Sequence, residues 1–184
     1  MHNKKKGGMG FRDIQAFNLA MLAKQAWRLI HHTHYLFYRV YKARYFPNCS
    51  FTEAKIGHNP SFVWRSLVAA REVIMEGSRW RVGNGRQIQA ESGNWLSHKP
   101  IFSREEWPNL RVGDLIDDRA WKWKRTMIVE IFAPRTCEEI LAILLSRECT
   151  QDTLIWKENR KHEFSVKSAY HVALRLNKQE VTEH

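Results

Sequence analysis

The chain has 184 residues, of which 43% are hydrophobic and 12% aromatic, and 30 Lys and Arg against 19 Asp and Glu give a net charge of +11. This length suits one domain of ordinary size, and the composition excludes a wholly disordered chain. Three scattered cysteines exclude a disulfide framework and predict a reducing, intracellular compartment; the location stays unknown, with the nucleus and the cytoplasm both open. The uncharged runs are too short to cross a bilayer, and no apolar signal-peptide core follows the basic start, so no membrane partner is expected.

The excess positive charge lies in the first half of the chain. Residues 1–50 carry nine basic side chains against one acidic, and residues 51–90 carry six against three. Residues 91–184 carry fifteen of each and are neutral. A concentrated basic excess suits a polyanion-binding surface, because phosphate contacts release counterions. The same charge would also serve solubility without any partner.

The first predicted element is a helix that follows a flexible basic segment. Residues 1–12 are expected to be irregular, because three glycines in four positions oppose a regular helix. Apolar residues then recur at steps of three and four, which predicts a helix from the N-cap Asp13 to about His31. Its apolar side is predicted to consist of Ile14, Phe17, Met21, Leu22, Leu29 and Ile30.

Two more helices are predicted before residue 78. The second covers residues 35–45, and Pro47 cannot continue it. A loop with several prolines, glycines and asparagines follows. The third helix covers residues 61–76, and Gly77 is a natural C-cap.

The pattern then changes period. Residues 79–82 and 86–89 alternate around the turn sequence Gly83-Asn84-Gly85, which predicts a β-hairpin. An irregular stretch is expected over 90–113, followed by helices over 118–132 and 137–144. A strand is expected over 152–156, and residues 163–164 are expected to pair back with it. The last predicted element is a helix over 166–176 that is capped by Ser165. The predicted fold is mainly α with one or two small β-hairpins, of the α+β class, with a helical N-terminal half and an irregular C-terminal half.

The second helix has a pattern of interleaved aromatic and basic residues. Tyr38, Tyr41 and Tyr45 fall on one helical face, and this face is flanked by the cations Arg39, Lys42 and Arg44. Such a stripe offers stacking to unpaired bases, with the cations holding the phosphate backbone. Alternatively, the tyrosines pack against the first helix, each phenol finding a partner at the rim. The basic residues remain available in either case.

Other candidate sites have ordinary structural explanations. Arg79, Arg81 and Arg86 form a second basic patch, which suits phosphate contact or a merely exposed ribbon face. The Gly83–Gly85 turn is capable of approaching a phosphate closely, but a hairpin turn needs the same residues. The histidines His31, His32 and His34 do not converge on a helix, so a solvated helix end is favoured over a metal site. Cys137 and Cys149 are expected to be buried free thiols.

Seven sequence blocks resemble plant LINE-type (non-LTR) retrotransposon reverse transcriptases. The first two are residues 7–13 (GGMGFRD) and 17–29 (FNLAMLAKQAWRL). The other blocks, in the same order and spacing as in that family, are 42–47 (KARYFP), 60–66 (PSFVWRS), 77–85 (GSRWRVGNG), 152–156 (DTLIW) and 164–170 (FSVKSAY). The resemblance covers most of residues 7–176.

The resemblance implies a connector that lies after the polymerase palm and before a Cys/His knuckle and any RNase H domain. On this basis the chain divides into a flexible basic segment (1–12), a helical connector with a hairpin (13–90), an irregular and helical segment (91–150), the truncated start of a zinc-binding-like region (151–176) and a tail (177–184). The knuckle cysteines of the family would lie beyond residue 176. Residues 90–101 also depart from the Trp-Asp-rich turn that the family usually carries there.

The resemblance further implies that this segment is not an enzyme. The polymerase of the family needs an aromatic-x-Asp-Asp hairpin, because two metal ions require clustered carboxylates. The only Asp-Asp pair here is Asp117-Asp118, which lies in a different block. A helix N-cap is its ordinary explanation.

The sequence therefore predicts a non-catalytic, nucleic-acid-contacting connector fragment of a plant LINE-type reverse transcriptase polyprotein, with no cofactor and no metal. Its expected partners are RNA or single-stranded DNA and neighbouring domains of the polyprotein; the oligomeric state stays open. The predicted contact residues are Lys4, Lys5, Lys6, Arg12, Lys24, Arg28, Arg39, Lys42, Arg44, Tyr38, Tyr41, Tyr45, Arg79, Arg81 and Arg86.

Two alternatives compete with this interpretation. One is a structural or protein-interaction spacer whose tryptophans pack on neighbouring domains, namely Trp64, Trp80, Trp107, Trp121 and Trp123. The other is a decayed retroelement remnant without selected activity.

Overall fold

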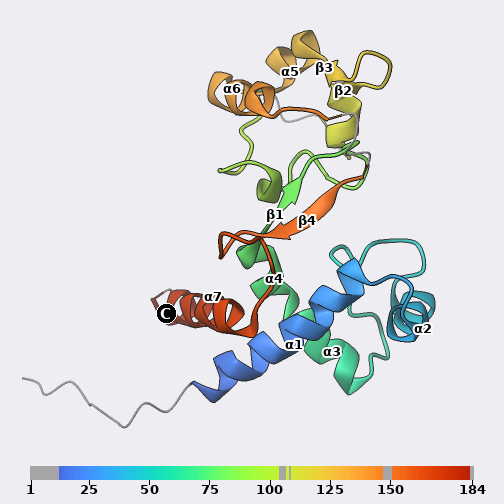
Figure 1. The fold of residues 1–184 in the computed structure, drawn as a ribbon, viewed down its shortest axis with the longest axis vertical. Helices are drawn as coiled ribbons and strands as arrows, with labels where there is room; N and C mark the ends of the chain where they lie inside the picture. The colour runs from blue at the N-terminus through green and yellow to red at the C-terminus, as the bar shows by residue number, and fades with distance from the viewer. Residues whose placement is uncertain (1–12, 104–106, 108, 147–150, 183–184) are drawn as a thin grey trace, which may run out of the picture. The chain divides into compact units, whose positions relative to one another are not determined.

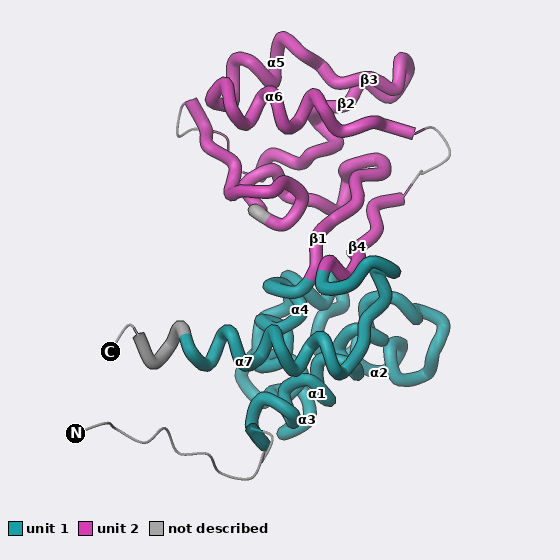
Figure 2. Tube along the Cα trace, turned by 60° about the vertical axis from the view of Figure 1, so that its left-hand side comes forward, with its two compact units in different colours: residues 1–77, 158–184 teal, residues 78–157 magenta. Residues whose placement is uncertain are grey.

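The computed structural model describes residues 13–103, 107, 109–146 and 151–182. The chain divides into two compact units, one made of residues 1–77 and 158–184 and the other of residues 78–157 (Figure 2). The described residues are mainly helical with two short two-stranded antiparallel sheets, which confirms the predicted mainly α, α+β class. The boundaries of the units do not coincide with those of the segments expected from the sequence, because the C-terminal helix belongs to the N-terminal unit. No helix of the described residues is long and apolar enough to span a membrane.

The first unit is built from helices alone in its described part. They are α1 (Ile14–His31), α2 (Leu36–Tyr45), α3 (Phe62–Ala69), α4 (Arg71–Gly77) and α7 (Val166–Thr182) (Figure 1). Asp13 caps α1 by accepting a hydrogen bond from the Ala16 N–H, as predicted. The predicted third helix is interrupted at Ala70 and becomes α3 and α4. The C-terminal helix predicted over 166–176 is longer than expected, because α7 continues to Thr182.

The core of the first unit is a seam of small residues between α1 and α7. The buried face of α1 consists of Ala16, Ala20, Ala23, Ala26 and Leu29. It packs mainly on α7, whose Ala169, Val172 and Ala173 are fully buried. The predicted apolar side is confirmed at Leu29, which is buried, and wrong at Ile14 and Met21, which are 72% and 42% exposed. Alanines allow the two helix backbones to approach closely, and the larger side chains are left at the edges of the contact.

A second part of this core surrounds Trp64 at the start of α3. The indole is fully buried and stacks on Phe46 at a centroid distance of 5.6 Å. Its Nε1–H donates to the carbonyl of Ile56 at 3.2 Å, so the polar edge of the ring is satisfied. Phe51 closes the cluster edge-on at 5.8 Å. The cluster fixes the loop between α2 and α3.

The second unit is a small α+β body. Its elements are β1 (Ser78–Arg81), the 3₁₀ turns η1 (Gly93–Trp95) and η2 (Val112–Leu115), β2 (Ile116–Asp117), β3 (Lys122–Trp123), α5 (Arg125–Ile131), α6 (Pro134–Ala142) and β4 (Thr153–Trp156). Its apolar core is formed by fully buried side chains from the loops and from α5 and α6. Those with no exposed area are Ile88, Ala90, Val112, Leu115, Ile128, Ile131 and Ile140.

The strand pairing of this unit corrects the predicted hairpin. β1 pairs antiparallel with β4, with Ser78 opposite Trp156 and Arg81 opposite Thr153. The segment after the turn contacts residues 110–112 instead, through the bridge between Gln89 and Arg111. Local alternation is satisfied by any partner strand, and β4 is a partner whose Leu154 and Trp156 are buried. The expected pairing segment at 163–164 is not a strand.

A buried carboxylate holds the turn that follows β1. Asp152 Oδ1 accepts hydrogen bonds from the N–H groups of Gly83 and Gly85, each at 2.8 Å, and Oδ2 accepts one from Gln87, also at 2.8 Å. A Cβ at residue 83 would overlap the carbonyl oxygen of Gln151. The glycines thus serve a close backbone packing, and Asp152 occupies the donors that a phosphate would need.

A short hairpin stands where a long helix was predicted. β2 and β3 pair through Ile116 with Trp123 and Asp117 with Lys122, so the helix predicted over 118–132 starts only at Arg125. Asp117 Oδ1 accepts from the N–H groups of Arg119 and Ala120 at 2.9 and 3.0 Å. These two bonds hold the pKa of Asp117 below its usual value. Asp117 therefore caps a turn and not a helix.

Candidate nucleic-acid interface

The positive charge of the chain belongs to one of the two units. The unit of residues 1–77 and 158–184 contains 17 Lys and Arg against 8 Asp and Glu, and residues 78–157 contain 13 against 11. The first unit thus carries +9 of the net charge of +11. The predicted contact residues Lys4, Lys5, Lys6 and Arg12 fall within it but lie outside the described residues.

Helix α1 presents a stripe of exposed cations beside its buried alanine seam. Phe17, Met21, Lys24 and Arg28 are spaced four, three and four residues apart, which places them on one face of the helix. Lys24 and Arg28 are exposed, and the Arg28 guanidinium reaches Gln25 Oε1 at 3.4 Å. No acidic residue lies within α1 itself. The face therefore carries two neighbouring cations, Lys24 and Arg28, and no acidic side chain of α1 neutralises them.

The three cations of α2 differ in their availability. Arg39 and Arg44 are exposed. Lys42 is half-buried, because its Nζ donates to the carbonyl of Cys49 at 2.7 Å and lies 5.3 Å from the centroid of Phe46. The Arg44 guanidinium lies 5.3 Å from the ring centroid of Tyr45. Arg39 and Arg44 are thus the α2 cations that stand ready for an anionic ligand.

The half-buried tyrosines of α2 contact Trp64 of α3 and Phe46, whereas the alternative interpretation placed them against the first helix. Tyr45 stacks on Trp64 with a centroid distance of 4.6 Å and an interplanar angle of 4°. Its hydroxyl accepts a hydrogen bond from the Ser61 N–H, and hydrogen bonding with Ser61 lowers its pKa. Burial raises the pKa of Tyr41, whose ring lies against Tyr45. Tyr38 meets Phe46 edge-on. These rings have protein partners where bases were expected.

A cavity opens beside the α1 cation stripe. It has a volume of about 500 Å³ and is lined by Phe17 of α1 and by Val166, Lys167, Tyr170 and His171 of α7. The Tyr170 hydroxyl accepts a hydrogen bond from the Asp13 N–H at 3.0 Å, which holds the ring at the start of α1. None of these four α7 residues was predicted as a site. The i, i+1, i+4, i+5 spacing of 166, 167, 170 and 171 shows one helical face, but only the packing of α7 on α1 brings it next to Phe17.

The arginines of the second unit form no single patch with a clear ligand. Arg79 and Arg81 are exposed on the same side of β1. Arg86 lies in the turn, where its guanidinium is 3.6 Å from the carboxylate of Asp118 and both side chains are largely exposed. An ion pair of this kind is weak, so Arg86 is only partly neutralised.

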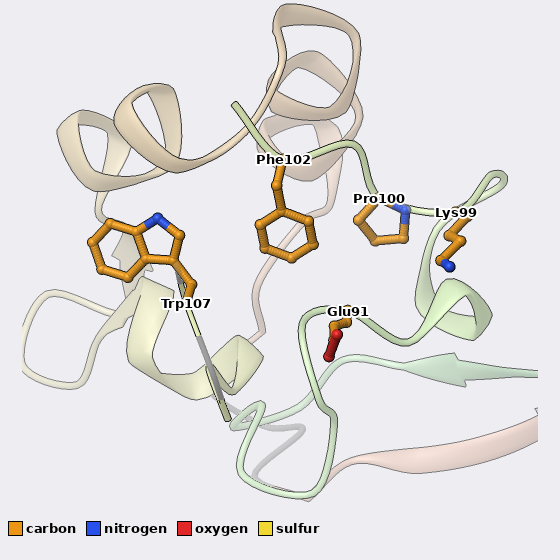
Figure 3. A pocket seen from close by; sticks show the side chains of 5 residues that line it. All are labelled: Glu91, Lys99, Pro100, Phe102 and Trp107. Atoms are coloured by element: carbon orange, nitrogen blue, oxygen red, sulfur yellow. The ribbon is translucent and has the colours of Figure 1, made fainter. Parts of the chain in front are cut away.

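The second unit also contains a cavity of about 580 Å³ (Figure 3). It is lined by Glu91, Lys99, Pro100, Phe102 and Trp107, and the ring of Phe102 lies between Trp107 and Pro100 in the view. The carboxylate of Glu91 opposes the charge of Lys99 in the same cavity. Such a pair suits a phosphate less well than a cavity lined by cations alone.

The remaining candidates have structural partners. Among the described residues no group of three or more His, Cys, Asp or Glu side chains is placed to hold a metal ion. His31 stacks on Trp27 at 4.2 Å, and His32 stacks on Tyr35 at 5.0 Å. Cys137 is buried, and its thiol lies within hydrogen-bonding distance of the Phe132 carbonyl. Burial raises the pKa of this thiol. Cys149 lies outside the described residues.

The tryptophans proposed for the alternative spacer role are not on the surface as a group. Trp64 is fully buried, and Trp123 donates its Nε1–H to the Ile143 carbonyl at 2.8 Å. Exposed apolar side chains are mostly aliphatic, with Leu36 at 73% and Val40 at 53% on α2. Others are Phe62 at 78% on α3 and Leu144 at 93%, so the exposed apolar side chains are spread over several elements, and α2 is one of them.

Two curated proteins of Arabidopsis thaliana are similar to this chain. An "uncharacterized mitochondrial protein" is 41% identical over 90 residues, which are 49% of this chain and 58% of that protein. A "putative ribonuclease H protein" is 29% identical over 178 residues, which are 91% of this chain and 28% of that protein. The chain thus spans less than two thirds of either relative. No family model matches the sequence, and no solved structure matches it. Together with the sequence blocks above, the two matches indicate a plant retrotransposon-related sequence.

Proposed function

We propose that the chain is a non-catalytic connector fragment of a plant LINE-type reverse transcriptase polyprotein, and that its first unit holds single-stranded RNA or DNA by the phosphate backbone. The observation that carries this proposal is the location of +9 of the net charge in one unit. The plant relatives support a retroelement origin, and the name of the second refers to an enzyme whose substrate contains RNA. The contact residues are the exposed cations of α1 and α2.

The geometry supports backbone contact more than base reading in α2. Lys24, Arg28, Arg39 and Arg44 are exposed, whereas the α2 tyrosines stack within the protein. Contacts from exposed cations to phosphates fix position without selecting a sequence. The expected binding is therefore tolerant of sequence and strongly dependent on salt.

Filter binding of single-stranded RNA and DNA across a salt series tests the proposal. Affinity that falls steeply with salt is expected, because each cation contact releases counterions. The paired variant Lys24→Gln with Arg28→Gln should weaken binding and reduce the salt slope by about 1.4 for a single strand. No affinity at low salt, or a flat slope, would count against the proposal.

A matched control uses two cations of the second unit. Lys122 and Arg125 are both exposed, so the pair Lys122→Gln with Arg125→Gln removes the same charge from another surface. Equal losses in the two double variants would mean that only net charge matters. An RNA–DNA hybrid incubated with the chain and Mg²⁺ should remain intact, and specific cleavage would overturn the non-catalytic part of the proposal.

The spacer alternative is favoured by one observation, the exposed apolar side of α2. Leu36 and Val40 lie four residues apart on this helix, and no residue of α2 is fully buried. A helix with no fully buried residue and an exposed apolar side suits a contact with another domain. Self-association of the isolated chain that Leu36→Ser with Val40→Ser abolishes would support this alternative.

A further inference from the structure

We infer that the cavity between α1 and α7 receives an unstacked nucleobase, with Phe17 and Tyr170 against the base and Lys167 and His171 near its phosphate. This inference rests on the proposed function, because it gives the same unit a base-binding site beside its backbone contacts. The site is distinct from the tyrosine stripe of α2, whose rings are already stacked on protein partners.

The cavity follows from the way the two helices pack. Ala16 and Ala20 of α1 and Ala169 of α7 are fully buried, and α1 packs mainly on α7. Phe17 follows Ala16, and Tyr170 follows Ala169, so each aromatic ring stands at the edge of the alanine seam. Both side chains are only half-buried. A volume of about 500 Å³ lies within the usual range for small-molecule sites.

Contacts within the protein hold the ring of Tyr170, which forms one side of the cavity. The Tyr170 hydroxyl accepts from the Asp13 N–H at 3.0 Å, and His171 lies edge-on to Tyr170 with a centroid distance of 5.7 Å. The Asp13 carboxylate accepts from the Ala16 N–H at 3.0 Å, so the acidic group nearest this bond is engaged as the helix cap. A preformed ring loses little entropy when a base stacks on it.

The charges around the cavity select an anionic ligand. Among the described residues that line it there are a lysine and a histidine and no carboxylate, in contrast to the cavity of the second unit, which contains Glu91. Lys24 and Arg28 continue from Phe17 along the same face of α1. Lys24 lies seven residues beyond Phe17, which is about 10 Å along the helix axis. A strand whose base enters the cavity therefore has cations available for its neighbouring phosphates.

These features fit a single strand better than a duplex. Aromatic side chains stack on any base, but a base inside a duplex is already stacked and paired. A free inorganic anion would use Lys167 and His171 without needing the rings. A loss of affinity when the Phe17 or Tyr170 ring is removed would therefore distinguish a nucleobase site from a simple anion site.

Fluorescence titration with a single-stranded DNA of about a dozen nucleotides, carrying one 2-aminopurine, tests the inference. Binding to the wild-type chain should change the probe fluorescence. Phe17→Leu and Tyr170→Leu should each lower affinity on the order of tenfold and remove the fluorescence change. Tyr170→Phe keeps the ring but loses the hydrogen bond from the Asp13 N–H, so it should retain the fluorescence change and most of the affinity. Folded Leu variants with wild-type affinity and fluorescence change would overturn the inference.

Two further measurements remain decisive if a Leu variant fails to fold. Lys167→Gln and His171→Gln change exposed side chains, and each should weaken binding of the same oligonucleotide. Photocrosslinking of a 5-iodouracil oligonucleotide to the wild-type chain should label a peptide containing Phe17 or Tyr170. Labelling confined to other peptides, with unchanged affinity in the Gln variants, would overturn the inference.

The outcomes also separate this inference from the proposed function. Salt-dependent binding that Lys24→Gln with Arg28→Gln weakens, but that the ring variants leave unchanged, removes the base site and keeps the backbone interface. Absence of binding by the wild-type chain at low salt removes both.

Discussion

Replacing Asp152 by alanine should destabilise the second unit more than any change of a surface charge. The carboxylate accepts three backbone hydrogen bonds, from Gly83, Gly85 and Gln87, each at 2.8 Å. Gly83 and Gly85 are buried, so water cannot replace the lost acceptor at these two groups. The turn would then lose the three hydrogen bonds that join it to the residue preceding β4.

The magnitude follows from the two buried donors. Each orphaned buried N–H costs about 1–3 kcal/mol, so Asp152→Ala should lower the free energy of unfolding by about 2–6 kcal/mol. Asp152→Asn keeps one side-chain oxygen for Gly83 and Gly85 and puts an amide donor opposite Gln87. Its expected cost is smaller, about 1–2 kcal/mol. Total stabilities are about 5–15 kcal/mol, so the alanine variant should be close to unfolding.

Urea unfolding followed by tryptophan fluorescence measures this effect, and hydrogen exchange of the amides of Gly83 and Gly85 localises it. Asp118→Asn is the control, because Asp118 has a side chain that is 65% exposed and only a 3.6 Å contact with Arg86. It should change the free energy of unfolding by less than about 1 kcal/mol. An Asp152→Ala variant that unfolds at the same urea concentration as the control would refute the reasoning.

Three other predictions follow from the packing. Gly85 has φ +69° and its Cβ would overlap the backbone nitrogen of Gly113, so Gly85→Ala should lower the thermal midpoint far more than Gly57→Ala, where φ is +79° but the space is open. Ala20→Leu should overpack the α1–α7 seam and cost about 1–3 kcal/mol in chemical unfolding, whereas Asn18→Leu on the exposed side should not. Because burial raises the pKa of Cys137, iodoacetamide at mildly alkaline pH should modify this thiol only after unfolding; mass spectrometry showing rapid modification of Cys137 in the folded chain would contradict its burial.

Local rules were sufficient for the first two helices. Asp13 has the side chain of an N-cap and accepts the expected hydrogen bond, and the second helix ends at Tyr45, before Pro47. These features depend on neighbours in sequence, so they are readable without the fold. The strand predicted over 152–156 is present as β4, Thr153–Trp156, in which Leu154 and Trp156 are buried.

The features that could not be predicted from the sequence depend on contacts between residues far apart in the chain. β1 pairs with a strand more than seventy residues away, so local alternation could not identify its partner. The buried face of α1 is made of alanines because α7 approaches it closely, and α7 comes from the other end of the chain. The same approach places Tyr170 beside Phe17, so the cavity could not be predicted from either helix alone.

The contacts of the half-buried α2 tyrosines with protein rings have a similar cause. Their spacing defines one face, which the sequence correctly indicated, but spacing does not say what that face contacts. Trp64 supplies the contact, as Tyr45 stacks on it with nearly parallel rings. Arg39 and Arg44 of α2 are exposed whichever residues the tyrosines contact, so the backbone-binding hypothesis does not depend on the tyrosines.

The salt dependence of single-strand binding by a chain with four neutralised cations tests the central claim most directly. The variant carries Lys24→Gln, Arg28→Gln, Arg39→Gln and Arg44→Gln, all at exposed positions of α1 and α2. If these side chains hold the phosphate backbone, the slope of log affinity against log salt should become shallower by about 3. A folded variant with the slope and affinity of the wild-type chain would contradict the account.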